Sequence, residues 1–236
     1  MKLLCVIPAH NEAANLATVV AEVRAWRRDG EILVVDDGST DGTGALLRRL
    51  DVRRLVFAER QGIGSAMRAA LKYAARAGFD TVVRIDGDGQ HPADQIGRLV
   101  APLERGVADV AFGSRYVHAG RGRVRRSAIA HRALAAVLTA LTRARVTDPT
   151  SGFCAIGPRA LPLLAEHHPT GYPEPELRLF LSRNALRVVE VAVRTRPRLS
   201  GCTSLTPRRT AAATARIALA MLIVPLRRRV AEAHDG

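Results

Sequence analysis

The sequence EILVVDDGSTDG occupies residues 31 to 42 and joins an apolar run to a polar turn. The apolar run has the length of a buried strand. The turn that follows is rich in Asp, Gly, Ser and Thr, which are residues that punctuate regular structure. This stretch therefore predicts a buried strand over 31–37 with polar side chains at its carboxyl end.

The same alternation of apolar strand and helix extends on both sides of this stretch. Apolar residues at helical spacing predict helices over about 16–23, 65–77 and 127–143. Strands that alternate with helices predict an α/β fold with a mostly parallel sheet covered on both faces. The other predicted strands are residues 2–8, 53–58, 81–88, 109–114 and 186–195.

Length and composition predict one globular domain with an appendage. The chain has 236 residues, of which 47% are hydrophobic and 25% charged, and these values exclude collagen-like and fully disordered classes. We expect a domain over 1–205 and a separate C-terminal helix over 206–236. The 3 cysteines are far apart and show no CxxC spacing, so neither a disulfide framework nor a zinc site is indicated. Reduced thiols in a cytoplasmic protein are expected.

The distribution of charge divides the chain into two halves. Residues 1–114 carry 15 basic and 15 acidic side chains, whereas residues 115–236 carry 21 arginines and 7 acids and so account for the whole net charge of +14. Residues 115–145 contain 8 arginines and no acid. A cationic half implies an anionic partner such as a phosphorylated acceptor, an acidic membrane surface or a nucleic acid.

The C-terminal segment is apolar and basic. Residues 211–226 are too few to span a bilayer, contain Arg216, and are followed by a run of arginines over 227–229. Such a segment predicts an amphipathic helix at the surface of an acidic leaflet, and a helix packed on the domain is the alternative. With no signal peptide visible at the N-terminus, we expect a cytoplasmic protein held peripherally at the inner face of the membrane.

Three polar clusters follow predicted strands directly: PAHNE at 8–12, DDGSTDG at 36–42 and DGDGQ at 86–90. In open α/β sheets the carboxyl ends of strands form the ligand site, so these clusters should converge. Carboxylate oxygens of Asp86 and Asp88, with the amide oxygen of Gln90, are suited to hold Mg²⁺ or Mn²⁺. Such a metal would neutralise a diphosphate leaving group.

Other motif assignments fail at identifiable positions. An EF-hand counted from Asp86 has His91 where the loop needs glycine, and one counted from Asp37 ends at Arg48 where it needs glutamate. The loop QGIGSA at 61–66 is suited to receive phosphate or ribose oxygens at a helix N-terminus. It lacks the third glycine of GxGxxG and the GK[ST] of a P-loop, so neither fingerprint is satisfied.

The motifs together resemble those of the family 2 glycosyltransferases, over about residues 3–205. IPAHNE, VVDDGSTDGT, GIGSA, DGDGQHP, GSRY and DPTSGF occur in the order and spacing of that family. DGDGQHP is most similar to the corresponding segment of the dolichyl-phosphate and polyprenyl-phosphate mannosyltransferase branch. The resemblance implies a GT-A fold, with 1–114 as the nucleotide-sugar half and 115–205 as the acceptor half. It also implies a GDP- or UDP-sugar donor, a divalent metal and inversion at the anomeric carbon.

The resemblance also implies roles for individual residues. Asp86, Asp88 and Gln90 would hold the metal, and Asp88 would be catalytic, whereas His91 is expected to be structural. Arg198 would reach the donor diphosphate. The residues implied in donor binding are Pro8, His10, Asn11, Glu12, Asp37, Gly38, Gly64, Asp86, Gly87 and Arg198.

An acceptor phosphate would be gripped by two arginines in this branch. Arg115 of GSRY fits the first and is also a candidate catalytic residue. For the second, Arg123 with Ser127 has the spacing of the family, whereas the paired-arginine pattern indicates Arg126. The choice between these arginines stays open at the level of sequence.

Glu174 is the third catalytic candidate, because the segment GYPEPEL at 171–177 lies where inverting family members place a carboxylate. A hydroxyl acceptor would need Glu174 as a base, whereas a phosphate acceptor is already ionised and would leave it to orient arginines. The sequence leaves this open.

The favoured function is metal-dependent, inverting transfer of a sugar to a polyprenyl phosphate. The alternative is transfer to a soluble or cell-envelope hydroxyl with Glu174 as base. A nucleic-acid partner is not expected, because Tyr116 is the only aromatic residue within the arginine-rich stretch before residue 152. A sugar nucleotidyltransferase is also disfavoured, since its Gly-rich signature near the first strand is missing.

Overall fold

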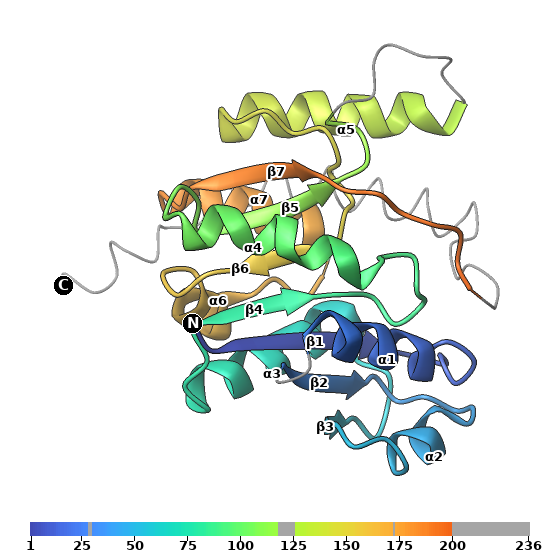
Figure 1. Cartoon of the computed structure of the whole chain (residues 1–236). Helices are drawn as coiled ribbons and strands as arrows, with labels where there is room; N and C mark the ends of the chain where they lie inside the picture. The colour runs from blue at the N-terminus through green and yellow to red at the C-terminus, as the bar shows by residue number, and fades with distance from the viewer. Residues whose placement is uncertain (28–29, 118–125, 172, 200–236) are drawn as a thin grey trace.

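The computed structural model describes residues 1–27, 30–117, 126–171 and 173–199. It shows a central sheet with helices on both faces (Figure 1). The C-terminal helix predicted over 206–236 and the candidate Arg123 lie outside the described residues. Within these residues, no helix is long and apolar enough to cross a membrane.

The sheet has seven strands in the order β3-β2-β1-β4-β6-β5-β7. Neighbouring strands are parallel except β6, which runs antiparallel to both β4 and β5. The strands are β1 Leu3–Ala9, β2 Glu31–Asp36, β3 Arg53–Val56, β4 Thr81–Arg84, β5 Val110–Ser114, β6 Cys154–Ile156 and β7 Val188–Ala192. The prediction of a mostly parallel α/β sheet is therefore confirmed.

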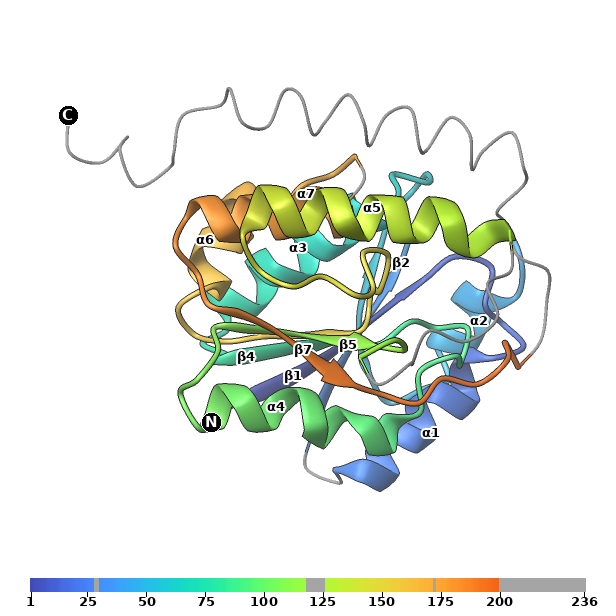
Figure 2. The same ribbon diagram turned by 90° about the horizontal axis from the view of Figure 1, so that it is seen from above.

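Helices cover both faces of this sheet (Figure 2). Helices α1 and α4 pack on one face, and α3, α6 and α7 pack on the other. Helix α5 contacts α7 through Leu138 and Leu179. The helices are α1 Leu16–Trp26, α2 Thr43–Leu47, α3 Ile63–Arg76, α4 Ile96–Glu104, α5 Arg126–Thr142, α6 Leu161–His167 and α7 Pro173–Arg183, with a short 3₁₀ turn η1 Ala93–Gln95 before α4.

The two-sided covering explains why the central strand β1 is continuously apolar. Every residue of β1 is buried. Leu4 and Val6 belong to the core under α3 and α6, whereas Leu3 and Cys5 belong to the core under α1 and α4. Successive side chains of a strand point to opposite faces, so a strand between two helical layers has no polar face.

Strand β6 was not predicted from the sequence. Its three residues, Cys154–Ile156, are fully buried between β4 and β5. A three-residue apolar run is too short for a periodicity to identify it, and its pairing partners are far away in the chain. The predicted strands over 53–58 and 81–88 end earlier, at Val56 and Arg84, where the ladder pairing with the neighbouring strands stops.

Candidate active site

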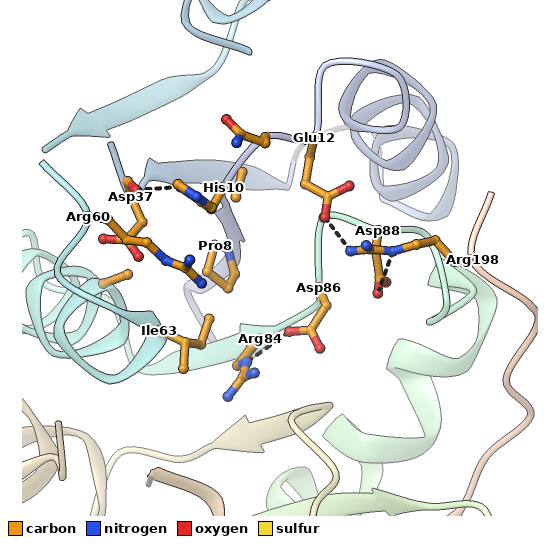
Figure 3. A pocket seen from close by; sticks show the side chains of 14 residues that line it. Pro8, His10, Glu12, Asp37, Arg60, Ile63, Arg84, Asp86, Asp88 and Arg198 are labelled. Carbon is orange, nitrogen blue, oxygen red and sulfur yellow. Dashed lines mark hydrogen bonds and ion pairs between the residues drawn. The ribbon is translucent and has the colours of Figure 1, made fainter. Parts of the chain in front are cut away.

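A cavity of about 490 Å³ lies at the carboxyl ends of β1, β2 and β4. These three strands are adjacent and parallel, so the polar loops that follow them meet at one edge, as the sequence predicted. Arg198 enters from the far end of the described chain (Figure 3). The lining residues are Pro8, Ala9, His10, Asn11, Glu12, Asp37, Arg60, Ile63, Ala66, Arg84, Asp86, Gly87, Asp88 and Arg198.

The loop after β1 is hydrogen-bonded to the loop after β2. His10 Nδ1 lies 2.8 Å from the carbonyl oxygen of Asp37. The backbone N–H of Asn11 donates to the hydroxyl of Ser39 at 2.9 Å, and the Asn11 side chain accepts from the backbone N–H of Thr40 at 2.8 Å. Asn11 has a φ of +59°, a left-handed conformation that asparagine tolerates better than most residues. These bonds fix the wall of the cavity formed by residues 10–12.

The carboxylate of Asp37 holds the loop that opens α3. It accepts from the backbone N–H of Gln61 at 2.6 Å and from that of Gly62 at 2.9 Å. Asp37 is nearly fully buried, although it lines the cavity. The carboxylate oxygens of Asp37 therefore position the loop at 61–62. The expected contact of Asp37 with a base or ribose stays a prediction.

Two of the predicted donor-site glycines do not line the cavity. A Cβ on Gly64 would lie 2.6 Å from the Cα of Thr170, and one on Gly38 would lie 2.5 Å from the backbone nitrogen of Arg60. Gly38 also has a φ of +63°. Close backbone packing therefore accounts for both glycines without a ligand, whereas Gly87 lies in the cavity wall.

Arg198 joins two acidic side chains at the cavity. Its Nη2 lies 2.5 Å from Oε1 of Glu12, and its Nε lies 3.4 Å from Oδ2 of Asp88 (Figure 3). Glu12 also accepts from Nδ2 of Asn15 at 2.7 Å. Burial raises the pKa of Glu12, and the bond from Asn15 and the charge of Arg198 only partly oppose that rise. The predicted donor residues Glu12 and Arg198 thus lie together beside the candidate metal ligand Asp88.

Arg84 joins Asp86 to Glu174. Its Nε donates to Oδ1 of Asp86 at 3.0 Å, and its Nη1 donates to Oε1 of Glu174 at 3.0 Å. Burial by itself would raise the pKa of Asp86, but the charge of Arg84 and the hydrogen bond that it donates outweigh burial and hold that pKa below its ordinary value. Asp86 is therefore ionised at neutral pH.

These carboxylates fit a divalent cation. Asp86 and Asp88 line the same wall and supply the hard oxygen ligands that Mg²⁺ and Mn²⁺ prefer. The described part of the chain contains no group of three or more His, Cys, Asp or Glu that could hold a metal. A two-carboxylate site completed by phosphate oxygens and water is the ordinary pattern for Mg²⁺. Gln90 lies next to this site: its backbone N–H donates to Oδ1 of Asp88 at 3.0 Å, but its side chain does not line the cavity.

His91 packs behind the DGDG loop. Its ring stacks on Phe153 with 4.8 Å between the centroids, and its Nδ1 accepts from the backbone N–H of Asp86 at 3.3 Å. Burial lowers the pKa of His91, so the ring is neutral and able to accept this bond. The expectation that His91 is structural agrees with this arrangement.

Arg115 is bound to a buried carboxylate. Its Nε and Nη2 donate to the two oxygens of Asp148 at 2.7 and 2.9 Å, and Asp148 is fully buried. The Arg115 side chain is 39% exposed and does not line the cavity. Its contact with an acceptor phosphate stays a prediction. Arg126 and Ser127 begin α5, but their side chains, like the whole of Arg123, are outside the described part of the structure.

Two charged cavity residues, Arg60 and Arg84, were missed by the sequence reasoning. Arg60 is exposed on the loop before α3 and points toward the cavity (Figure 3). Arg84 lies within an otherwise apolar strand, and this was the available signal, because a buried arginine requires partners. The sequence did not identify those partners, since Glu174 is 90 residues away.

Comparison with known proteins identifies a family for this chain. The family model for glycosyl transferase family 2 matches residues 4–161. The chain is 40% identical over 125 residues to the polyprenol monophosphomannose synthase of Mycolicibacterium smegmatis. This aligned region covers 50% of this chain and 47% of that protein. It is 34% identical over 126 residues to the undecaprenyl-phosphate mannosyltransferase of Micrococcus luteus, which covers 51% of each. The matches thus span about half the length of these curated relatives.

A solved structure shares the fold. The glucosyl-3-phosphoglycerate synthase of Mycobacterium tuberculosis, crystallised with Mn²⁺, uridine diphosphate and phosphoglyceric acid, superposes with a TM-score of 0.67 at 25% identity, covering 94% of this chain and 78% of that one. The family match covers most of the described domain, and the clusters that line the cavity after β1, β2 and β4 all fall within it. The chain therefore belongs to glycosyl transferase family 2.

Proposed function

We propose that this chain transfers a sugar from a GDP- or UDP-sugar to a polyprenyl phosphate, with Mg²⁺ or Mn²⁺ and with inversion at the anomeric carbon. The observation that carries the proposal is the cavity at the carboxyl ends of β1, β2 and β4, where Asp86 and Asp88 face the same space as Arg198. The names of the relatives support the lipid-phosphate acceptor. The solved neighbour with bound Mn²⁺ and uridine diphosphate supports the donor class and the metal.

In this proposal each group of cavity residues has its own role. A divalent cation held by Asp86 and Asp88 would neutralise charge on the leaving diphosphate. Arg198 would exchange its contact with Asp88 for one with a diphosphate oxygen, because a guanidinium matches the geometry of phosphate. The loops at 10–12 and 37–38 would shape the nucleoside end of the site. Arg115, Arg123, Arg126 and Ser127 remain the candidates for gripping the acceptor phosphate.

The environment of Glu174 favours a phosphate acceptor. A general base needs a carboxylate free to reach the proton that it removes. Glu174 is 19% exposed, and its Oε1 accepts a charge-assisted hydrogen bond from Arg84 at 3.0 Å. A lipid phosphate is ionised at neutral pH and attacks without a base. In our proposal Glu174 therefore orients Arg84.

A hydroxyl acceptor is the second candidate function. It is favoured by one observation, namely that the solved neighbour binds phosphoglyceric acid. In this alternative, Glu174 would leave Arg84 and take a proton from the acceptor hydroxyl. The two candidates differ in whether Glu174 is required and in whether the product partitions into organic solvent.

Contact with a membrane surface forms part of the proposal. Residues 115–145 carry 8 arginines and no acid, and a segment of this charge is attracted to anionic headgroups. We propose a peripheral position at the inner face of the cell membrane, where this segment and residues 206–236 would meet the lipid acceptor.

The test is a transfer assay with radiolabelled nucleotide sugars, polyprenyl phosphate in detergent and Mg²⁺ or Mn²⁺. We expect label in the organic phase, and we expect EDTA to remove it. A parallel reaction with phosphoglyceric acid and other soluble hydroxyl acceptors tests the second candidate. Asp88→Asn should abolish transfer, whereas Asp94→Asn, in an exposed ion pair with Arg194, should not. Labelling of soluble acceptors alone would refute the lipid-phosphate proposal.

A further inference from the structure

Arg84 is a buried cation at the end of β4, beneath the cavity. Its side chain is 8% exposed, and it lines the cavity together with Asp86. It also borders a small space of about 10 Å³ that Glu174, Ser151 and His168 help to line. The guanidinium therefore lies between the donor cavity and helix α7.

Two arms of this guanidinium contact two different parts of the chain. Nε bonds Asp86, in the loop that follows β4, and Nη1 bonds Glu174, in the first turn of α7. Each distance is 3.0 Å. The planar geometry of arginine fixes the angle between these bonds, which a lysine ammonium would not do.

The third side of the guanidinium is fixed by Gly152. A Cβ on Gly152 would lie 2.3 Å from Nη2 and 2.5 Å from Cζ of Arg84. The guanidinium of Arg84 therefore occupies space that is open only because residue 152 has no side chain. The turn before β6, strand β4 and helix α7 together determine the position of this one side chain.

The bond to Arg84 sets how Asp86 is presented to the cavity. Oδ1 of Asp86 is engaged by Arg84, and Oδ2 lies 3.8 Å from Nδ1 of the buried His91. A carboxylate with one oxygen held by the protein has a restricted orientation, and such outer contacts determine how well a ligand binds its metal. Without Arg84, Asp86 would rotate and the partly buried Glu174 would lose its cation.

We propose that Arg84 is a positioning residue that orients Asp86 for the cation and the donor diphosphate by tying it to Glu174 of α7. This inference rests on the proposed function, because it assigns Asp86 to that site. In this inference Arg84 acts through the orientation of Asp86, to which its Nε donates. Its loss is therefore expected to act on metal affinity and on turnover more than on the KM for the acceptor.

The test uses four variants of the full chain: Arg84→Met, Arg84→Lys, Glu174→Gln and the double variant R84M/E174Q. Mn²⁺ binding is measured by electron paramagnetic resonance of the free ion, with Mn²⁺ alone and with UDP or GDP present, and folding is checked by circular dichroism. The control is Arg187→Met, because Arg187 pairs with Asp109 away from the cavity lining. Steady-state kcat and KM for the donor are measured alongside.

We expect Arg84→Met to weaken Mn²⁺ binding by about 10- to 100-fold, the usual cost of losing a partner that orients a metal ligand. Arg84→Lys should be intermediate, and Arg187→Met should bind Mn²⁺ like the wild type. The double variant removes the unpaired Glu174 charge and should recover the thermal stability lost in Arg84→Met, but its Mn²⁺ affinity should stay low. That separation between stability and metal affinity would establish the positioning role.

Two results would overturn the inference. Wild-type Mn²⁺ affinity in folded Arg84→Met would show that Arg84 does not orient Asp86. Recovery of wild-type affinity and kcat in R84M/E174Q would show that Arg84 only neutralises Glu174. If Arg84→Met does not fold, Arg84→Lys and the double variant decide by the same criterion. Mn²⁺ binding that depends on Arg84, in a chain that labels no lipid, would refute the proposed acceptor and leave this inference standing.

Discussion

Arg198 and Asp88 form an ion pair at the cavity, with 3.4 Å between Nε and Oδ2, although they are far apart in the sequence. The same guanidinium contacts Glu12. The residue proposed to bind the donor diphosphate thus lies against a residue proposed to bind the metal. A cation at Asp88 and a diphosphate at Arg198 would each replace one half of this pair, so we expect metal and donor to bind cooperatively.

Replacement of Arg198 tests this relationship. Arg198→Gln should raise the KM for the nucleotide sugar by about 10-fold or more, because a charge-assisted bond to phosphate contributes roughly 1.5–3 kcal/mol. It should also increase Mn²⁺ affinity in the absence of nucleotide, since a competing cation is removed from Asp88. Isothermal titration with Mn²⁺ and UDP or GDP measures both effects.

The matched control for Arg198 is Arg194→Gln. Arg194 lies on the same segment but pairs with the exposed Asp94. Its replacement should change neither constant. Equal effects of the two variants would mean that Arg198 contributes only general positive charge.

Glu174→Gln distinguishes the two acceptor classes. The amide oxygen of glutamine still accepts from Arg84, so in the lipid-phosphate reaction kcat should stay within about threefold of the wild type. In a hydroxyl reaction, loss of a general base should lower kcat by about 10²–10⁴-fold. Initial rates with polyprenyl phosphate and with soluble hydroxyl acceptors, at saturating donor, provide the comparison.

Arg115→Ala should affect both acceptor binding and stability. Acceptor KM should rise far more than donor KM if Arg115 grips the acceptor phosphate. Removal of Arg115 also takes two hydrogen bonds from the buried Asp148, which should lower the free energy of unfolding by about 1–3 kcal/mol. Chemical denaturation and steady-state kinetics measure the two effects separately.

The double variant R115A/D148N separates them further. Because the Asp148→Asn change removes the buried charge, stability should partly recover while acceptor KM stays high. Equal changes in the KM for donor and acceptor in both variants would refute the phosphate role.

His168 predicts a pH dependence of folding. It is buried, and burial lowers its pKa to about 4. Because an unfolded histidine titrates near 6.5, the unfolded chain binds the extra proton between about pH 6.5 and 4. Stability should therefore fall as the pH drops through this window, by up to about 3 kcal/mol from His168. Urea unfolding of wild type and His168→Gln between pH 7 and 4 should show a weaker pH slope for the variant; identical slopes would contradict this assignment.

The sequence predicted the polar clusters that line the cavity better than the ion pairs that hold them in place. The clusters at 8–12, 36–42 and 86–90 meet as expected, because each follows a strand and these strands are neighbours in a parallel sheet. The pairing of Arg84 with Glu174 was not predictable, because ion pairs between distant segments depend on how the helices pack. Gly64 was assigned to the donor on motif grounds, whereas in the structure its place is explained by the close approach of Thr170.

The reversed direction of β6 has a topological consequence for the segment between β5 and β6. The chain leaves β5 at Ser114 on the cavity edge of the sheet, and because β6 is antiparallel it re-enters the sheet on that same edge at Cys154. Residues 115–153 thus leave and rejoin the sheet at the edge where the cavity lies. The middle of such a segment can change in length without shifting the register of any strand, whereas its end at Gly152 is constrained by the guanidinium of Arg84. Under the proposed function, a chain with this topology would change its acceptor through that middle part while its donor cavity stays intact.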